Sequence, residues 1–250
     1  MPRRPRSLLI TGASSGIGEA LARHYAAPGV ALALTGRDGE RLAAAAAACR
    51  AQGAAVDAAT IDVTKRDCLR AWIERVDDAA PLDLVIANAG IGQAREDEAT
   101  ARRVFATNLD GVLNTVFPVL PRMTARHGGQ IALMSSLSAF RGLPAAPSYS
   151  ASKAAVMSLG QAWRLLLAAD GISVCVICPG FVTTRLTARN KFAMPFVMPA
   201  ERAAAIIARG LARDHGRIAF PWPLAMMAWL MGALPWRLSD ALTRRVATRG

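Results

Sequence analysis

The chain has 250 residues, 53% of them hydrophobic, and a net charge of +12. This length is sufficient for one α/β domain with a full core, and the hydrophobic content excludes a disordered protein. The arginines are scattered, without the interleaved aromatic residues of a single-strand nucleic-acid groove. We therefore expect a single domain over 1–250 that binds no nucleic acid.

The cysteines and the N-terminus indicate the compartment. Cys175 and Cys178 have CxxC spacing but lie in an apolar run that predicts a strand, where positions three apart face opposite sides. This disfavours a redox pair or a metal clip, and we expect no metal. The basic start of the chain leads straight into a predicted strand, without the apolar core of a secretory signal. We expect a cytoplasmic protein.

Short apolar runs alternate with helical stretches along the chain. Strands are predicted at 7–11, 30–35, 55–61, 82–87, 130–135, 172–178 and 217–220. Helices are predicted at 16–27, 40–51, 64–79, 100–126, 149–170 and 200–214. This alternation is typical of a parallel sheet, and about seven strands predict a doubly wound α/β fold of the Rossmann type.

A glycine-rich turn, TGASSGIG, follows the first predicted strand at 11–18. Its glycines permit a sharp turn and remove Cβ atoms where the backbone must approach a pyrophosphate. The start of the next helix favours an anion through its N–H groups and dipole. A purely structural turn is the alternative, but the flanking strand and helix favour a dinucleotide site. Its candidate residues are Gly12, Ser14, Ser15, Gly16, Ile17 and Gly18.

The end of the second predicted strand bears on the choice of cofactor. An acidic residue closing this strand would bind a free ribose 2′-hydroxyl and repel a 2′-phosphate. Gly36 stands there instead, and Arg37 follows it with a guanidinium suited to phosphate. This favours NADP over NAD. Asp38 keeps NAD open, because a different strand end would place it near the ribose.

Tyr149 and Lys153 are four residues apart at the start of a strongly helical stretch, so both lie on one face. A free tyrosine has a pKa of about 10, and an adjacent cation is expected to lower that value toward the working range of a general acid or base. A solvated pair on a helix surface is the alternative. The chain has only two tyrosines and three lysines, which makes that spacing less easily accidental.

The GxxxGxG turn and the YxxxK of 149–153 together resemble the short-chain dehydrogenase/reductase family of the classical type. The resemblance covers nearly all of residues 7–220 and implies a catalytic serine 13 residues before the tyrosine, which selects Ser136 over Ser135 and Ser138. Asn108 resembles the family's fourth catalytic member, whose backbone holds a water. Local bending or capping is the alternative for this asparagine.

The same resemblance implies further cofactor contacts. They include Tyr149 and Lys153 themselves, the pair that borders the adenine, the NAG turn after the fourth strand, and the PGxxxT segment that holds the carboxamide. These residues are Asp62, Val63, Asn88, Ala89, Gly90, Pro179, Gly180, Val182 and Thr184.

The implied reaction is reduction of a carbonyl to a secondary alcohol with NADPH, or the reverse. Ser136 and Tyr149 would stabilise the growing oxyanion, Tyr149 would supply the proton, and Lys153 would orient the nicotinamide ribose. An NADPH-binding sensor or scaffold without turnover is the alternative. It has no need of a tyrosine and a lysine at this spacing.

After residue 220 the chain departs from the commonest family pattern. Residues 218–236 carry no charge and include three tryptophans. The longest proline-free stretch, 224–234, would span about 16 Å as a helix, too short for an apolar bilayer core of about 30 Å. The apolar extension 221–250 is therefore a lid, a subunit contact or a peripheral membrane contact through 222–236, and we favour the first two.

The substrate and the assembly are predicted more coarsely. Residues 185–200 occupy the position of the family's substrate loop, and phenylalanines and methionines alternate there with small residues. Together with the tail they favour a hydrophobic carbonyl or alcohol as substrate. The helical stretches 100–126 and 149–169 resemble those of the family's dimer interface, which implies a homodimer or homotetramer.

Overall fold

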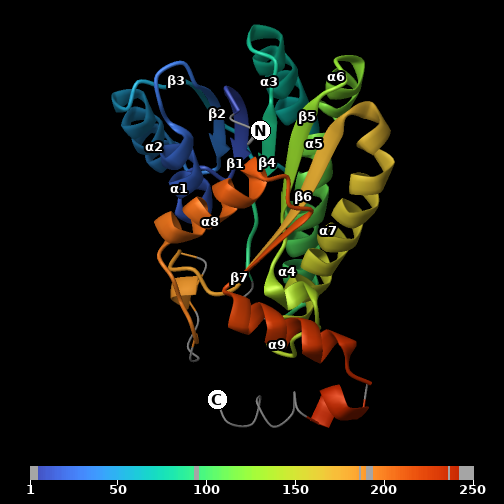
Figure 1. Cartoon of the computed structure of the whole chain (residues 1–250). Helices are drawn as coiled ribbons and strands as arrows, with labels where there is room; N and C mark the ends of the chain where they lie inside the picture. The colour runs from blue at the N-terminus through green and yellow to red at the C-terminus, as the bar shows by residue number, and fades with distance from the viewer. Residues whose placement is uncertain (1–4, 93–95, 186, 190–193, 236, 242–250) are drawn as a thin grey trace.

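The computed structural model describes residues 5–92, 96–185, 187–189, 194–235 and 237–241. Seven strands form one sheet in the order β3-β2-β1-β4-β5-β6-β7, and every neighbouring pair is parallel. Helices cover both faces of the sheet (Figure 1). The predicted single-domain, doubly wound Rossmann fold is confirmed.

The strands lie within two residues of their predicted bounds. They are β1 (Ser7–Thr11), β2 (Ala31–Gly36), β3 (Ala55–Thr60), β4 (Leu84–Ala87), β5 (Gly129–Met134), β6 (Ile172–Pro179) and β7 (Arg217–Phe220). The helices are α1 (Gly16–Tyr25), α2 (Gly39–Ala51), α3 (Arg66–Ala79), α4 (Glu98–Phe105), α5 (Gly111–Val116), α6 (Leu120–Ala125), α7 (Pro147–Leu166), α8 (Ala200–Ala212) and α9 (Trp222–Ala233). Short helical turns are η1 (Ala106–Asp110), η2 (Leu137–Ala139), η3 (Ala168–Asp170) and η4 (Thr187–Arg189).

The strands are continuously apolar because both faces of the sheet are buried. Leu8 and Ile10 pack on the face covered by α1, whereas Leu9 packs on the face covered by α3 and α7. The same alternation separates the CxxC pair, because Cys175 belongs to the first core cluster and Cys178 to a third cluster beside α9. Both thiols are free and buried, as expected for opposite faces.

The prediction of one continuous helix over 100–126 is wrong. Pro118 lacks an N–H and its ring clashes with the preceding turn, so α5 ends at Val116 and α6 begins at Leu120. The segment before α5 winds as a π-helical turn, η1, which contains Asn108. Single π turns of this kind often occur at functional sites.

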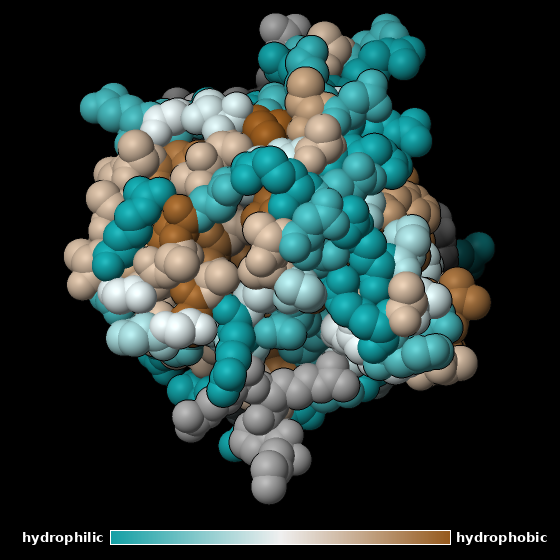
Figure 2. All heavy atoms as spheres, turned by 90° about the horizontal axis from the view of Figure 1, so that it is seen from above, coloured by the Kyte–Doolittle hydropathy of each residue, from teal (hydrophilic) through white to brown (hydrophobic). Residues whose placement is uncertain are grey.

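The strand order reverses at β1 and β4, which are neighbours in the sheet. Ligands of doubly wound sheets bind outside the carboxyl ends of the strands at this switch point. That end lies at the bottom of Figure 1, where α9 is attached. Figure 2 looks at the opposite end, where hydrophilic side chains cover much of the surface.

Asp77 in α3 is a buried carboxylate that ties α3 to α6 and to the loop before β4. It accepts hydrogen bonds from the Leu82 N–H at 2.8 Å and from Arg126 at 2.8 and 2.9 Å. Burial alone would raise the pKa of Asp77, but these hydrogen bonds hold it below its ordinary value. The ion pair therefore stabilises the folded protein at every pH at which Asp77 is charged.

We expect Asp77→Asn to lower the free energy of unfolding by about 3 kcal/mol at neutral pH, because Arg126 loses its buried partner. The exposed Asp78→Asn serves as the control and should cost under about 1 kcal/mol. Because the folded pKa is depressed, the contribution of Asp77 is full above the unfolded pKa of about 3.9 and is lost as pH falls below it. Urea unfolding at several pH values measures both effects, and equal stabilities of wild type and Asp77→Asn at pH 7 would contradict them.

Candidate active site

The glycine turn between β1 and α1 has the backbone shape that a pyrophosphate requires. Gly12 and Gly16 are left-handed, with φ of +69° and +60°. A Cβ on Gly18 would lie 2.3 Å from the Gly12 carbonyl oxygen, so α1 rests directly on the turn. The side chain of Ser15 does not cap α1. In the described part of the chain, N–H groups of the first turn of α1 can therefore bind an anion.

The predicted NAG turn after β4 braces this glycine turn from the side. Asn88 Nδ2 donates to the carbonyl oxygens of Thr11 at 2.8 Å and Gly12 at 3.3 Å. The Thr11 hydroxyl in return accepts from the N–H groups of Asn88 and Ala89, both at 3.1 Å. Thr11 is a positioning residue that the motif analysis missed, although it stands directly before the first glycine.

We expect Gly18→Ala to destabilise the protein by about 1–3 kcal/mol, because the new methyl group would overlap the Gly12 carbonyl and Asn88 Nδ2. For a domain of this size the corresponding fall in Tm is about 3–10 °C. Gly142→Ala is the matched control, since a Cβ there meets no described atom within 4 Å. Thermal unfolding of both variants decides the matter, and an unchanged Tm for Gly18→Ala would show that α1 does not rest on the turn.

The residues predicted to select the cofactor lie at the ends of β2 and β3. β2 ends at Gly36, and Asp38 caps α2 by accepting from the Arg41 N–H at 3.0 Å while its carboxylate pairs with the Arg41 side chain. Arg37 is exposed, with Nη1 3.9 Å from Asp62 Oδ2. Asp62 itself is fixed by hydrogen bonds from the Thr64 N–H and hydroxyl, both at 2.9 Å. A strand end that would bring Asp38 to the ribose is not observed.

Tyr149 and Lys153 lie on the first turns of α7, which begins at Pro147 beside the end of β5. The Ser136 hydroxyl lies near Tyr149 and acts on its pKa as a hydrogen-bonding group. Lys153 Nζ donates to the Met134 carbonyl oxygen at 2.8 Å and lies 5.8 Å from the centroid of the Tyr149 ring. The structure thus brings the predicted serine, tyrosine and lysine together.

Ser135 ties β5 to α7 next to this group. Its hydroxyl donates to the Lys153 carbonyl oxygen at 2.7 Å, which fixes the backbone of the lysine. Ser136 accepts from the Ser138 N–H at 3.2 Å, so its hydroxyl oxygen also caps the η2 turn. Ser135 therefore fixes the backbone of Lys153, whereas Ser136 caps η2 and acts on the pKa of Tyr149.

Burial dominates the titration of these groups. It raises the pKa of Tyr149, against a smaller lowering by the Ser136 hydrogen bond, and it lowers the pKa of Lys153 to about 8. We expected an adjacent cation to lower the pKa of Tyr149. Among the described residues, no cation of the protein has this effect. The physical reason is that Lys153 Nζ lies over the ring and is bound to Met134, while the hydroxyl is desolvated.

Asn108 connects the NAG turn to α7 through its side chain. Its Oδ1 accepts from the Ile91 N–H at 2.8 Å, and its Nδ2 donates to the Ile91 carbonyl at 3.0 Å and to the Ser152 hydroxyl at 3.1 Å. A Cβ on Gly90 would lie 3.3 Å from both Asn108 Oδ1 and Lys153 Nζ. Asn108 is thus placed beside the lysine, and its expected water-holding role stays a prediction.

The PGxxxT segment after β6 faces the glycine turn. Thr187 donates its hydroxyl to the Val182 carbonyl at 2.6 Å and accepts from the Thr184 N–H at 3.0 Å. The Thr184 methyl group lies 2.9 Å from where a Cβ of Gly16 would be. Thr187, which the sequence analysis did not single out, therefore holds the shape of this loop.

These residues meet at the carboxyl ends of β1, β4, β5 and β6, around a glycine cradle that a Cβ would fill. The cradle fits a pyrophosphate at α1, and Tyr149 with Lys153 lies beyond it. The family model for the short chain dehydrogenase matches residues 6–193. The chain belongs to the short-chain dehydrogenase family.

Two further comparisons agree with this assignment. An uncharacterized oxidoreductase of Myxococcus xanthus is 39% identical over 246 residues, which cover 96% of this chain and 97% of that protein. A short-chain dehydrogenase from Sphingobium yanoikuyae, solved in complex with NADPH, has 30% identity and a TM-score of 0.79, and the match covers 92% of this chain and 96% of that one.

A short-chain dehydrogenase from Mycobacterium paratuberculosis, solved bound to NAD, has 26% identity and a TM-score of 0.79. The match covers 88% of this chain and 98% of that one. The short-chain dehydrogenase described here is therefore an oxidoreductase that uses a nicotinamide cofactor, and solved relatives of the same fold carry either NADPH or NAD.

Proposed function

We propose that this short-chain dehydrogenase reduces a hydrophobic carbonyl compound to a secondary alcohol with NADPH, or runs the reverse reaction. The convergence of Ser136, Tyr149 and Lys153 is the observation that carries the proposal: Lys153 Nζ lies 5.8 Å from the centroid of the tyrosine ring, and Ser136 is near enough to the tyrosine to act on its pKa. The alternative, a sensor that binds NADPH without turnover, gives no reason for a half-buried phenol and a buried ammonium side by side.

Each residue has a role in this reaction. When bound, the nicotinamide supplies or accepts the hydride. Ser136 donates a hydrogen bond to the substrate oxygen, and Tyr149 transfers the proton to that oxygen as negative charge develops on it. Lys153 orients the nicotinamide ribose. Val182 and Thr184 hold the carboxamide, and Asn108 supports the lysine.

The preference for NADP rests on the adenosine end of the site. Arg37 is exposed there, and among the described residues its one ion pair is the long contact to Asp62, while Asp38 is occupied as the cap of α2. A 2′-phosphate would accept charge-assisted hydrogen bonds from the Arg37 guanidinium. The phosphates of the cofactor would bind at Gly12–Gly18 and α1.

The apolar substrate class is supported by the composition of residues 185–200 and of the C-terminal extension, where phenylalanine, methionine and tryptophan recur. Residues 185–200 are proposed as the substrate loop, of which 186 and 190–193 lie outside the described residues.

The assembly and the location belong to the same proposal. Leu165 and Leu166 at the end of α7 are 82% and 69% exposed, which supports a homodimer or homotetramer formed through this helix. The free cysteines support a cytoplasmic location. No helix in the described part of the chain is long and apolar enough to span a membrane.

The test is to follow NADPH and NADH absorbance with a panel of ketones, aldehydes and 3-oxoacyl thioesters. We expect turnover on hydrophobic carbonyl compounds with NADPH, and weaker turnover with NADH. Tight binding of NADPH without turnover on any of them would favour the sensor. Saturation by small polar sugars alone would overturn the apolar substrate class.

A further inference from the structure

α9 is an apolar helix of 12 residues that is only partly packed onto the fold. Its inner side holds Leu224, buried against Gly180, and Gly232, whose missing Cβ lets it approach the Phe140 carbonyl oxygen. Its outer side is exposed and entirely apolar. We call this side the α9 face: Trp222 is 73% exposed, and Met226, Met227, Trp229 and Leu230 are between 50% and 55% exposed.

A contiguous apolar surface of this kind marks an interaction site rather than ordinary solvent-exposed surface. The α9 face does not line the catalytic end, because the opposite, inner side of α9 makes the contacts with that part of the fold. A lid over the catalytic end would use this inner side and not the α9 face. The α9 face is therefore suited to bind a partner surface outside the fold of this chain.

The charge of the chain is concentrated in the same part of the sequence. The last 80 residues have eleven Lys or Arg and three Asp or Glu, whereas the first 170 have 19 and 15. The final segment, 237–250, follows α9 directly and contains four arginines and one aspartate. A net charge of +8, out of +12, thus belongs to the part of the chain that includes α9.

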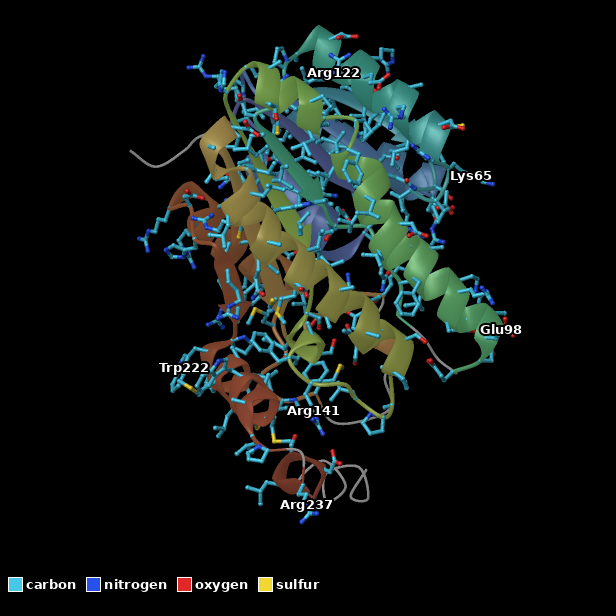
Figure 3. All side chains as sticks on the ribbon, turned by 90° about the vertical axis from the view of Figure 1, so that its right-hand side faces the viewer. Lys65, Glu98, Arg122, Arg141, Trp222 and Arg237 are labelled. Atoms are coloured by element: carbon cyan, nitrogen blue, oxygen red, sulfur yellow. The ribbon has the colours of Figure 1, made fainter. Side chains whose placement is uncertain are left out.

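Described arginines flank the α9 face in space. Arg217 stacks on the Phe140 ring at 5.4 Å, and Arg141 pairs with Asp240. Arg237 is exposed just beyond α9, and Figure 3 shows Trp222, Arg141 and Arg237 at the same end of the molecule. Arg217 and Arg237 give the apolar face a basic margin, whereas the charge of Arg141 is balanced by Asp240.

The apolar α9 face and its basic margin together indicate whether a second copy of the chain or a lipid surface binds there. A second copy bound symmetrically through the α9 face would place one basic margin against another, and like charges across an interface are unfavourable. An anionic lipid surface satisfies both features, because tryptophan and apolar side chains enter the headgroup boundary while arginines bind the acidic headgroups. A helix about 18 Å long lies in the plane of such a surface rather than crossing it.

We propose that the α9 face docks on an anionic membrane surface. α9 packs on η2, the turn that follows Ser136, so docking would bring the catalytic end beside the lipid. An apolar carbonyl substrate dissolved in the bilayer would then reach the site directly. This last consequence rests on the proposed function, whereas the docking itself does not.

The test is co-sedimentation of the full chain, without cofactor or substrate, with vesicles of phosphatidylcholine alone or mixed with phosphatidylglycerol. We expect binding to the anionic vesicles that weakens with salt, and weaker binding to phosphatidylcholine. The triple variant Trp222→Ser, Met226→Ser, Trp229→Ser should bind at least about tenfold more weakly. Arg237→Gln should weaken binding to the anionic vesicles only.

Lys65→Gln is the matched control for Arg237→Gln, because Lys65 is also exposed but lies at the start of α3, away from α9 in Figure 3, and it should bind like wild type. Wild type left in the supernatant, or a triple variant that sediments like wild type, would overturn the proposal. So would size-exclusion chromatography showing that the triple variant splits a wild-type dimer. NADPH turnover on a water-soluble ketone is measured in parallel, so failure to bind lipid and failure to catalyse are distinguished.

Discussion

Replacing Tyr149 with phenylalanine is expected to lower kcat about a thousandfold, the usual contribution of a positioned general acid. The variant removes one oxygen atom and leaves the half-buried ring and Lys153 in place. NADPH binding, followed by fluorescence titration, should therefore change by less than about threefold. The loss should appear in single-turnover hydride transfer, since the proton donor and not the cofactor site has been removed.

The chain offers a matched control in Tyr25, the other of its two tyrosines. Tyr25 closes α1 and packs on the core cluster of that face, away from Ser136. Tyr25→Phe should keep near wild-type turnover. If Tyr149→Phe kept more than about a tenth of the activity, the proton would have to come from another group and the proposed roles would be wrong.

The strands and the site motifs could be predicted because each depends on local sequence. A strand buried on both faces is a short apolar run between glycine or polar turns, as in Ile172–Pro179, and its bounds hardly depend on the rest of the fold. Gly12 and Gly16 could be placed because the turn after β1 demands positive φ at both.

The remaining features depend on contacts between distant segments. Nothing near Thr11 predicts that its hydroxyl accepts hydrogen bonds from a turn 77 residues away. The break of the predicted helix at 100–126 is the exception, because Pro118 is a local signal that the apolar spacing on both sides of it obscured. The π turn at Asn108, by contrast, goes with its pairing to Ile91. The raised pKa of Tyr149 follows from burial, which sequence spacing does not report.

Arg37→Ser is expected to weaken NADPH binding about 10–100-fold and to leave NADH binding nearly unchanged. The loss corresponds to charge-assisted hydrogen bonds to the 2′-phosphate, a group that NADH lacks. Arg50→Ser is the control, because it removes the same charge from the other end of α2, where Arg50 donates to the Val56 carbonyl. Equal losses for both cofactors in Arg37→Ser would contradict the assigned NADP preference.

A full reversal of the cofactor preference from NADPH to NADH requires two further changes, at positions 36 and 14. An aspartate at position 36 would bind the ribose hydroxyl, but a Cβ on Gly36 would lie 2.8 Å from Ser14 Oγ and 2.9 Å from Ser14 Cβ. We therefore expect Gly36→Asp with Arg37→Ser to bind both cofactors poorly, because Ser14 must move. Adding Ser14→Gly removes the overlap and should yield an enzyme that prefers NADH. If the double variant already binds NADH well, Ser14 yields without cost and does not restrict the residue at position 36.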